Sequence, residues 1–360
     1  MIRNSTFIGN KSRNHGGAVY TYLYTPDTAL IEGSYFADNQ VSQSPGGRSF
    51  GGALVHHQGN LTLRNSTFVN NSAEMYGGAM MIAQSSKGSW HESTVSNVTA
   101  TNNRADDPKQ AKGLGGALFV SGGLVTVENS TLAGNFADTL GGGIYSKDDN
   151  VRIRNTIIAN NRSGNGTGAS QQCYLTFSSS SANLQSPGPG KNCSADAILA
   201  DPKLADLAQN GGRTMTMALL AGSPAIDRGS NCAASDQRGA ARVGRCDIGA
   251  FEYGATPSSP EGMTAPSLEQ PNTAGPAVRA AWSNVPGATR YEVKVDVKSG
   301  LTVQQPNLES LSAALALVLD IGSYDLQVRA CNAEGCGPYS NARSVTIDVA
   351  PEKIFCRRPC

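Results

Sequence analysis

Asn65-Ser66-Thr67-Phe68-Val69-Asn70-Asn71 and Gly77-Gly78-Ala79-Met80 are the stretches of sequence that decide the fold, because close copies of both recur along the chain. The asparagine that closes the first phrase returns at intervals of 29, 32, 32, 32 and 26 residues, at Asn10, Asn39, Asn71, Asn103, Asn135 and Asn161. The glycine pair of the second phrase returns between most of them, at Gly16-Gly17, Gly51-Gly52, Gly77-Gly78, Gly115-Gly116 and Gly141-Gly142. Two phrases that share one period predict a repeat architecture.

Short stretches between these phrases alternate apolar and polar residues, as in Leu61-Thr62-Leu63 and Val125-Thr126-Val127. This alternation predicts β-strands, and no amphipathic helix pattern interrupts the first 165 residues. A repeat of three short strands predicts one coil of a parallel β-helix, in which each strand pairs with the strands of the coils above and below. The residues expected in its interior are Leu61, Leu63, Phe68, Val125, Val127 and Leu132.

The recurrent asparagines and glycines are expected to shape the corners of the coil. Asparagine tolerates the left-handed backbone conformation of a sharp corner, and stacked amide side chains can hydrogen-bond along a column. Glycine pairs suit positions where the backbone bends or where no Cβ fits. The asparagines are therefore interpreted as parts of the scaffold.

The composition limits the classes of function. The chain has 360 residues, enough for two domains, and a formal net charge of +1, which favours neither a nucleic acid nor an anionic membrane as a partner. No stretch approaches the roughly 20 apolar residues that a membrane-spanning helix needs. The chain is already inside a repeat at Asn4, so we expect it to be part of a longer protein with a preceding segment.

Eight cysteines fall into local pairs, which favour disulfide bonds and an oxidising compartment. A zinc site is the weaker alternative, because the chain has no Cys-x-x-Cys pair and its histidines lie far from the cysteines in sequence. The expected location is therefore extracellular, either secreted or at the cell surface. The expected disulfides are Cys173–Cys193, Cys232–Cys246, Cys331–Cys336 and Cys356–Cys360.

The alternation of a Gly-Gly-Ala-aliphatic phrase with Phe-x-x-Asn resembles the polymorphic outer membrane protein repeat of bacterial surface adhesins. A second resemblance, to the terminal segment of large exported bacterial β-helix proteins, rests on Asp201-Pro202-Lys203-Leu204, Asn210-Gly211-Gly212, Gly222-Ser223-Pro224-Ala225-Ile226-Asp227, Asp236-Gln237-Arg238-Gly239 and Cys246-Asp247-Ile248-Gly249-Ala250-Phe251-Glu252. Together these resemblances cover residues 1–254. They imply an all-β fold, a right-handed parallel β-helix with a disulfide-clipped C-terminal end, and export from a bacterium.

A second domain is expected after a linker at residues 255–262, which is rich in proline, serine and glycine. Residues 263–350 resemble a fibronectin type III β-sandwich, with Trp282 as the buried anchor, Tyr291 on the next strand and Tyr324 as the corner tyrosine. The resemblance implies a spacer that presents the first domain. The tail at residues 351–360 has no interpretation beyond its cysteine pair.

The strand phase predicts an outward-facing stripe on the strands that follow the glycine pairs. The candidate ligand-binding residues are Tyr20, Tyr22, His57, Met81, Phe119, Tyr145 and Lys147. Exposed aromatic side chains in a line suit stacking against sugar rings. Two alternatives stay open: a loop or the C-terminal segment covers this face, or a register shift of one residue turns the stripe inward.

The most charged loop supplies the only catalytic candidates, which are Asp106, Asp107, Lys109 and Lys112. Paired carboxylates beside lysine could bind Ca²⁺ and supply a base, as polysaccharide lyases require. The alternative is an ordinary solvated loop. No other metal site or cofactor is expected, and catalytic residues are otherwise unassigned.

Two functional hypotheses follow. The favoured one is an extracellular carbohydrate-binding or adhesive β-helix module, expected to be a monomer, whose partner is a polysaccharide or a cell-surface glycan and whose fibronectin type III domain is a spacer. The alternative is a polysaccharide lyase or glycoside hydrolase that uses the groove beside the same strands. Because the sequence shows no convergent carboxylate cluster outside the Asp106–Lys112 loop, binding is favoured over catalysis.

Overall fold

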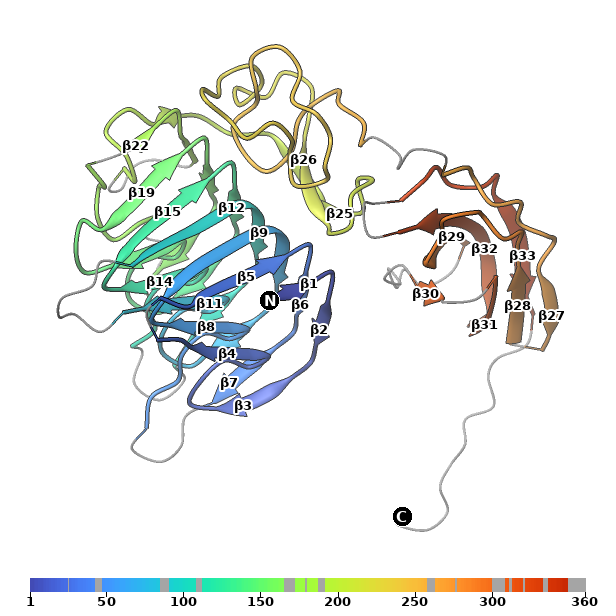
Figure 1. The fold of residues 1–360 in the computed structure, drawn as a ribbon, viewed down its shortest axis with the longest axis horizontal. Helices are drawn as coiled ribbons and strands as arrows, with labels where there is room; N and C mark the ends of the chain where they lie inside the picture. The colour runs from blue at the N-terminus through green and yellow to red at the C-terminus, as the bar shows by residue number, and fades with distance from the viewer. Residues whose placement is uncertain are drawn as a thin grey trace, which may run out of the picture. The chain divides into compact units, whose positions relative to one another are not determined.

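The structure is a computed structural model. It describes the chain except for residues 25, 43–46, 85–90, 108–111, 165–171, 179, 187–191, 258–262, 276, 300–307, 311–312, 320, 333–335 and 349–360. The chain divides into two compact units, Met1–Pro257 and Ser258–Cys360. The described residues contain strands, turns and bends and no helix, so the expected all-β class is confirmed (Figure 1).

The first unit contains three parallel sheets. The largest holds β1 (Ile2–Arg3), β2 (Thr6–Ile8), β5 (Thr28–Glu32), β6 (Tyr35–Ala37), β9 (Asn60–Val69), β12 (Glu92–Thr101), β15 (Leu124–Glu128), β16 (Thr131–Ala133), β19 (Val151–Arg154), β20 (Ile157–Ala159), β22 (Ser180–Ser181), β23 (Leu184–Ser186) and β24 (Ile198–Leu199). The six-stranded sheet holds β3 (Lys11–Arg13), β7 (Gln40–Ser42), β10 (Ser72–Ala73), β13 (Arg104–Ala105), β17 (Phe136–Ala137) and β21 (Arg162–Ser163). The five-stranded sheet holds β4 (Val19–Tyr22), β8 (Leu54–His57), β11 (Met80–Ala83), β14 (Leu118–Ser121) and β18 (Ile144–Ser146).

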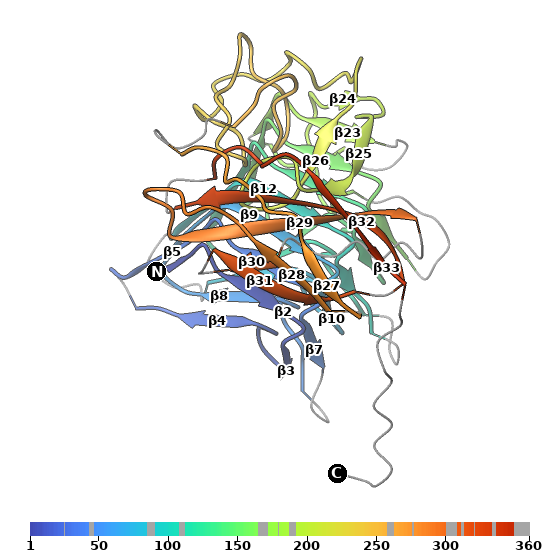
Figure 2. The ribbon, with the colours of Figure 1, turned by 90° about the vertical axis from the view of Figure 1, so that its right-hand side faces the viewer.

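Each of the first five repeats, from β1–β4 to β15–β18, contributes to all three sheets in turn. In the five-stranded sheet the order is β18-β14-β11-β8-β4, so neighbouring strands come from neighbouring repeats. The long strands β9 and β12 run through two consecutive stretches of the largest sheet, which other repeats build from two shorter strands. Figure 2 shows β3 and β4 at one end of this stack, β9 and β12 within it, and β23 and β24 at the other end.

The interior of the first unit is apolar, as the alternation predicts. All six residues expected inside are at most 1% exposed: Leu61, Leu63, Phe68, Val125, Val127 and Leu132. The rings of Phe7, Phe36 and Phe68 stack in a column, with centroid distances of 4.9 and 4.5 Å. Parallel register places equivalent side chains one strand spacing apart, and the phrase repeats because of this stacking.

The closing asparagines form a hydrogen-bonded column, the asparagine ladder, which consists of Asn10, Asn39, Asn71, Asn103, Asn135 and Asn161. Asn71 is representative: its backbone N–H and its Nδ2 both donate to Oδ1 of Asn103, at 3.0 and 2.9 Å. Its Nδ2 also donates to the carbonyl of Phe36 at 3.0 Å. The column ends on Gln172, whose Oε1 accepts from Nδ2 of Asn161 at 2.8 Å.

The left-handed backbone conformation that was expected at the closing asparagines is found at other residues. Asn71 and Asn103 are absent from the residues with positive φ, whereas the residues just before them, Asn70 (φ 54°) and Asn102 (φ 56°), have it. The residue that opens the phrase also has it, as at Asn65 (φ 52°). The prediction was therefore wrong about which asparagine turns the corner, because the closing asparagine must point inward to satisfy buried backbone groups.

The glycine pairs lie where backbones pass very close to each other. A Cβ on Gly52 would lie 2.0 Å from the carbonyl oxygen of Gly78, and a Cβ on Gly78 would lie 2.2 Å from that of Gly116. No side chain fits at those distances, so this second glycine of each pair is required by stacking.

Residues 201–254 run along the outer face of the largest sheet. Thr67 and Thr99, in register on β9 and β12, hydrogen-bond to Gln237, with distances of 2.9 and 2.7 Å. Thr67 also donates to the carbonyl of Met215 at 2.5 Å. This segment includes the antiparallel pair β25 (Leu204–Ala208) and β26 (Thr216–Leu219).

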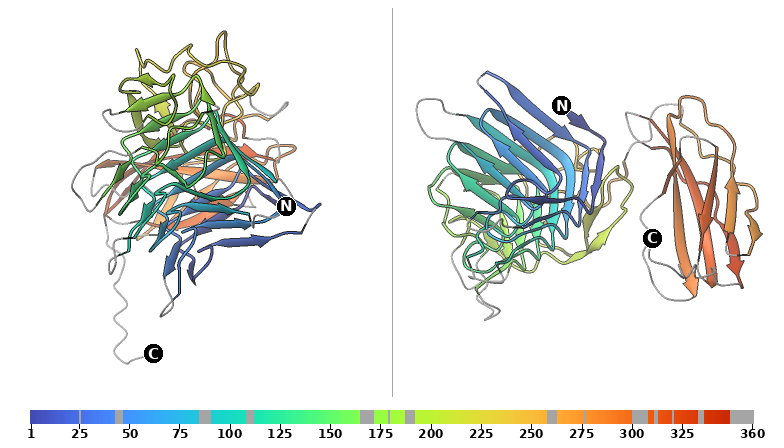
Figure 3. Two further views of the ribbon diagram at one scale, coloured as in Figure 1. Left: turned by 90° about the vertical axis from the view of Figure 1, so that its left-hand side faces the viewer. Right: turned by 90° about the horizontal axis from the view of Figure 1, so that it is seen from below.

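The second unit consists of two antiparallel sheets, which Figure 3 shows as two layers. One sheet has the order β27 (Asn272–Ala274), β28 (Ala277–Ala281), β31 (Ala314–Val318), and the other has the order β30 (Leu308–Ser310), β29 (Arg290–Ser299), β32 (Gly322–Cys331), β33 (Arg343–Ile347). Trp282 is buried in its core, as the resemblance implied, and Tyr291 and Tyr324 are buried there as well. The rings of Trp282 and Tyr291 lie 5.5 Å apart.

Three of the four expected disulfides are present, Cys173–Cys193, Cys232–Cys246 and Cys331–Cys336. The first two belong to the first unit and the third to the second unit. The expected Cys356–Cys360 pair lies outside the described residues.

Candidate functional site

The five-stranded sheet carries the predicted outward stripe, in the predicted register. Parallel pairing places Tyr20, Val55, Met81, Phe119 and Tyr145 in one row across the strands. A second row, two residues further along each strand, holds Tyr22, His57, Ala83 and Ser121. Lys147 follows the end of β18 and is exposed.

The two rows are unevenly exposed. Tyr20 and Tyr22 are 48% and 41% exposed, whereas Val55 and Ala83 are buried although they occupy the same outward rows. Small side chains are shielded where larger ones stand beside them in a row. His56 is fully buried and His57 only partly, so the two histidines face opposite sides of β8 as strand alternation requires.

Six aromatic rings form a continuous column, the aromatic ladder, which consists of His15, Phe50, Tyr76, Phe119, Tyr145 and Tyr174. Neighbouring ring centroids lie between 4.8 and 5.4 Å apart. Phe50 and Tyr76 each stand just before a glycine pair. Isolated β-bridges align this position from one repeat to the next. The stripe expected from the strands alone missed these rings. The recurrence of an aromatic or leucine before each glycine pair is the sequence signal that could have found them.

Ring stacking limits which aromatic surfaces, in the ladder and beside it, can contact a ligand. The planes of Phe119 and Tyr145 are 4° from parallel, so their faces cover each other and their edges face outward. The more open rings lie on the first repeat, where Tyr24 is 70% exposed and its ring contacts that of Tyr22 edge-on at 5.4 Å. Tyr22 in turn lies 4.9 Å from the ring of His57.

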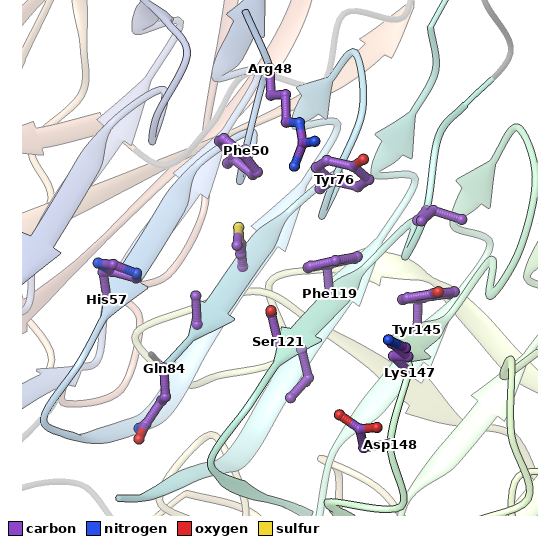
Figure 4. A pocket seen from close by; sticks show the side chains of 14 residues that line it. Arg48, Phe50, His57, Tyr76, Gln84, Phe119, Ser121, Tyr145, Lys147 and Asp148 are labelled. Carbon is purple, nitrogen blue, oxygen red and sulfur yellow. The ribbon is translucent and has the colours of Figure 1, made fainter. Parts of the chain in front are cut away.

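An open groove of about 460 Å³ runs beside the ladder (Figure 4). Its lining residues are Arg48, Phe50, His57, Tyr76, Met81, Ala83, Gln84, Leu114, Phe119, Val120, Ser121, Tyr145, Lys147 and Asp148. None of residues 201–254 is among them, so the C-terminal segment lies on a different face from the groove. The groove therefore combines an aromatic wall with charged and amide groups.

The polar groups of the groove lie on both sides of the aromatic wall. Figure 4 shows Arg48 near Phe50 and Tyr76, and Gln84, Ser121 and Asp148 on the opposite side. This arrangement can hold an amphipathic ligand, with apolar surface against the rings and polar groups at its edges.

Two side chains of the groove have shifted acid–base properties. Burial, and then the charge of His15, lower the pKa of His57, which favours the neutral imidazole at physiological pH. Burial, and then the charges of Tyr174, Tyr76 and Asp148, raise the pKa of Tyr145, so its phenol stays protonated and able to donate a hydrogen bond.

The catalytic candidates lie elsewhere in the first unit. Asp106 pairs with Arg104 at 2.5 Å, and Asp107 is buried and donates its backbone N–H to a carboxylate oxygen of Asp138. Lys112 is exposed, and Lys109 lies outside the described residues. Neither aspartate lines the groove. A catalytic or Ca²⁺-binding role for this loop stays a prediction.

Within the described residues, one group of three potential metal ligands lies close together: Glu292, Cys331 and Cys336. The two sulfurs are joined in a disulfide and Glu292 pairs with Arg290 and Arg329. This donor set does not fit a metal ion, because a thiolate ligand requires a free cysteine.

Two family models match this chain, one within each unit. A family model for the Chlamydia polymorphic membrane protein repeat matches residues 4–22, which hold one asparagine phrase and one glycine pair. A family model for the N-terminal domain of chitinase A matches residues 270–351. No curated protein matches the chain. The described part of the chain contains no helix long and apolar enough to span a membrane.

A similar solved structure is the solution structure of the fibronectin type III domain of human fibronectin type III domain containing protein 3. It is 19% identical, with a TM-score of 0.22, and the comparison covers 26% of this chain and 92% of that chain. The match to residues 4–22 fits the resemblance of the first unit to a bacterial surface-protein repeat, and the match to residues 270–351 lies in the unit that resembles a fibronectin type III domain.

Proposed function

We propose that this chain is an extracellular bacterial module that binds polysaccharide or cell-surface glycan in the groove of its first unit. In this proposal residues 1–254 are a closed, right-handed parallel β-helix and the second unit is a spacer. The match to a surface-protein repeat and the disulfides support an extracellular location. The match to the N-terminal domain of a chitinase supports a carbohydrate context.

The observation that carries the proposal is the aromatic ladder beside the groove. Sugars present both C–H surface and hydroxyl groups, and aromatic side chains flanked by polar groups suit both. Tyr20, Tyr22 and Tyr24 offer the more exposed ring surface, while Phe119 and Tyr145 present a rigid apolar edge. The ligand therefore contacts open rings at the first repeat and ring edges further along.

Catalysis in the groove has less support. Glycoside hydrolysis in most families uses two carboxylates that flank the scissile bond. Among the described residues that line the groove, Asp148 is the one carboxylate. Binding without cleavage is therefore the function that the geometry favours.

A panel of immobilised plant, fungal and bacterial polysaccharides tests the proposal. The full chain should be retained by at least one polysaccharide, and Tyr22→Ala should weaken retention. A reducing-sugar assay on the same panel should stay at background. If no polysaccharide retains the chain, the proposal fails. Release of reducing ends would instead favour a polysaccharide lyase or glycoside hydrolase.

A further inference from the structure

The groove carries more positive than negative charge. Arg48 and Lys147 both line it and are both exposed, whereas Asp148 is the one carboxylate among the described lining residues. His57 adds no charge near neutral pH, because burial lowers the pKa of its imidazole. The chain as a whole is almost neutral, with a formal net charge of +1, so the excess of positive charge is a local property of the groove.

Neither cation is neutralised by the residues that the structure describes around it. The ion pairs of the described part of the first unit involve neither Arg48 nor Lys147. By contrast, Arg64 on β9 pairs with Glu32 at 2.6 Å. Residues 43–46, which precede Arg48 and lie outside the described residues, contain no aspartate or glutamate. Both charges are therefore available to an anionic ligand.

The two cations stand at different points along the aromatic ladder. Arg48 precedes Phe50 in the second repeat, and Lys147 follows β18 in the fifth. Three coil steps separate these repeats, which amounts to about 14 Å along the stack at the spacing of β-strands. Figure 4 shows Arg48 beside Tyr76 and Lys147 beside Tyr145. A ligand that meets both cations must therefore extend along the rings.

The end of the groove near Lys147 also offers an uncharged donor. Tyr145 and Lys147 both line the groove and are two residues apart on the chain. The phenol of Tyr145 stays protonated, because burial raises its pKa, and can donate a hydrogen bond. A carboxylate or sulfate group only accepts hydrogen bonds, so the ammonium and the phenol suit the same anionic group.

Resting on the proposed function, we propose that the groove selects an acidic polysaccharide, whose anionic groups lie at Arg48 and Lys147 while its sugar rings lie along the aromatic wall. The chemistry required is an oxyanion on a sugar, which either a uronate or a sulfate ester supplies. A guanidinium binds two oxygens of one oxyanion, and an ammonium acts as a point charge. A chain that carries anions at intervals meets both cations at once, which raises its affinity above that of a single acidic sugar.

The test measures dissociation constants of the full chain for two matched pairs of immobilised polysaccharides, polygalacturonate with its methyl ester and dextran sulfate with dextran. Wild type should bind at least one acidic member more tightly than its neutral partner. This binding should weaken as the salt concentration rises, because exposed charges are screened. A preference for polygalacturonate assigns the anion as a carboxylate and a preference for dextran sulfate assigns it as a sulfate, and either supports the proposal.

Three variants connect the preference to the groove. Arg48→Gln combined with Lys147→Gln should weaken binding to the acidic polysaccharide about tenfold. Asp148→Asn removes the opposing carboxylate and should strengthen binding about threefold, a gain that misfolding does not produce. The matched control, Lys11→Gln combined with Arg152→Gln, removes two positive charges from exposed positions of β3 and β19 in the other two sheets. It should bind as wild type does.

The outcomes separate this inference from the proposed function. If wild type binds polysaccharide but binds each neutral member as tightly as its acidic partner, the acidic preference is wrong while glycan binding by the groove stands. An equal loss in the control and in the Arg48 and Lys147 double variant also overturns it, because the attraction then does not come from the groove. If wild type binds none of these polysaccharides and none of the wider panel, the proposed function itself fails.

Discussion

The rings of Phe119 and Tyr145 lie 5.2 Å apart with their planes 4° from parallel, although 26 residues separate them in sequence. Phe119 also contacts Tyr76 at 4.8 Å, so it links the rings that precede the glycine pairs to those on the strands. Each aromatic contact adds about 0.5–1.5 kcal/mol beyond area burial. The ladder therefore stiffens the wall of the groove.

Replacing Phe119 should measure this contribution. Phe119→Leu should lower the free energy of unfolding by about 1–2 kcal/mol, because both ring contacts are lost while most apolar contact remains. Phe119→Tyr keeps the ring and should stay within about 0.5 kcal/mol of wild type. Urea denaturation gives both values. Equal stability of Phe119→Leu and wild type would show that the ring contacts contribute nothing.

The asparagine ladder should be more sensitive to substitution than the corner beside it. Oδ1 of Asn103 accepts from the backbone and the side chain of Asn71, and its Nδ2 donates to Oδ1 of Asn135. Asn103→Ala leaves several buried groups unsatisfied and should cost about 3 kcal/mol or more. Asn102→Gly, at the adjacent position with φ of 56°, should change stability by a few tenths of a kcal/mol. A larger loss for Asn102→Gly than for Asn103→Ala would contradict the assigned roles.

The sequence predicted the repeat, the parallel pairing, the buried face and the outward row, because each follows from side chains that recur at one period. It could not predict which asparagine turns the corner, since Asn70 and Asn71 are identical residues with different backbone conformations. Nor could it place residues 201–254 over Thr67 and Thr99, because strand alternation says that a threonine points outward but not what covers it.

The candidate site was predicted in part. The row from Tyr20 to Tyr145 follows from strand phase, whereas Phe50 and Tyr76 join it only through the path of the backbone at the glycine pairs. Arg48 lies along the same groove as Lys147 only because their coils stack, which the spacing of the two residues in sequence does not reveal.

Asp138 should make stability depend on pH. Burial is the main cause that raises its pKa, to about 6, and the charge and hydrogen bond of Asp106 add to it. Because the pKa is raised in the folded state, the protonated carboxyl stabilises the fold fully below about pH 4. That contribution is lost as the pH rises through 6.

The matching variant is Asp138→Asn, which keeps an acceptor for the backbone N–H of Asp107. Relative to wild type, this variant should gain about 1 kcal/mol of stability between pH 4 and pH 7. This gain is smaller than the free energy that corresponds to the whole pKa shift of Asp138, because solvent screens the charge. Asp106→Asn should lower the midpoint of the wild-type transition. Urea denaturation at a series of pH values measures both effects, and parallel curves for wild type and Asp138→Asn would refute the prediction.

Glu292 should be required for the stability of the second unit. Its carboxylate accepts from Arg329 at 2.6 Å and from Arg290 at 2.5 Å, and all three side chains are buried. Burial alone would raise the pKa of Glu292, but the two guanidinium groups outweigh it and hold the pKa below its usual value. Stability from this carboxylate is therefore present above the ordinary pKa and lost as the pH falls through the lowered one.

Glu292→Gln leaves two buried guanidinium groups without a counter-charge and should destabilise the second unit by about 3 kcal/mol. Glu269→Gln, at an exposed position of the same unit, is the control and should be neutral. Calorimetry should show one transition shifted to lower temperature in Glu292→Gln. The proposed spacer role further predicts that polysaccharide binding is unchanged at a temperature where both units are folded. Loss of binding there would place part of the site in the second unit.

Binding of polysaccharide by the groove side of the five-stranded sheet is measured by the dissociation constant of the chain for the polysaccharide that retains it. Tyr20 and Tyr22 are exposed, so replacing both with alanine leaves the core intact. We expect roughly tenfold weaker binding for the double variant. The constant should be unchanged for Tyr253→Ala, which removes an equally exposed tyrosine from the 201–254 segment. Equal affinity of wild type and the double variant, or an equal loss in Tyr253→Ala, would show that this face of the sheet is not the binding site.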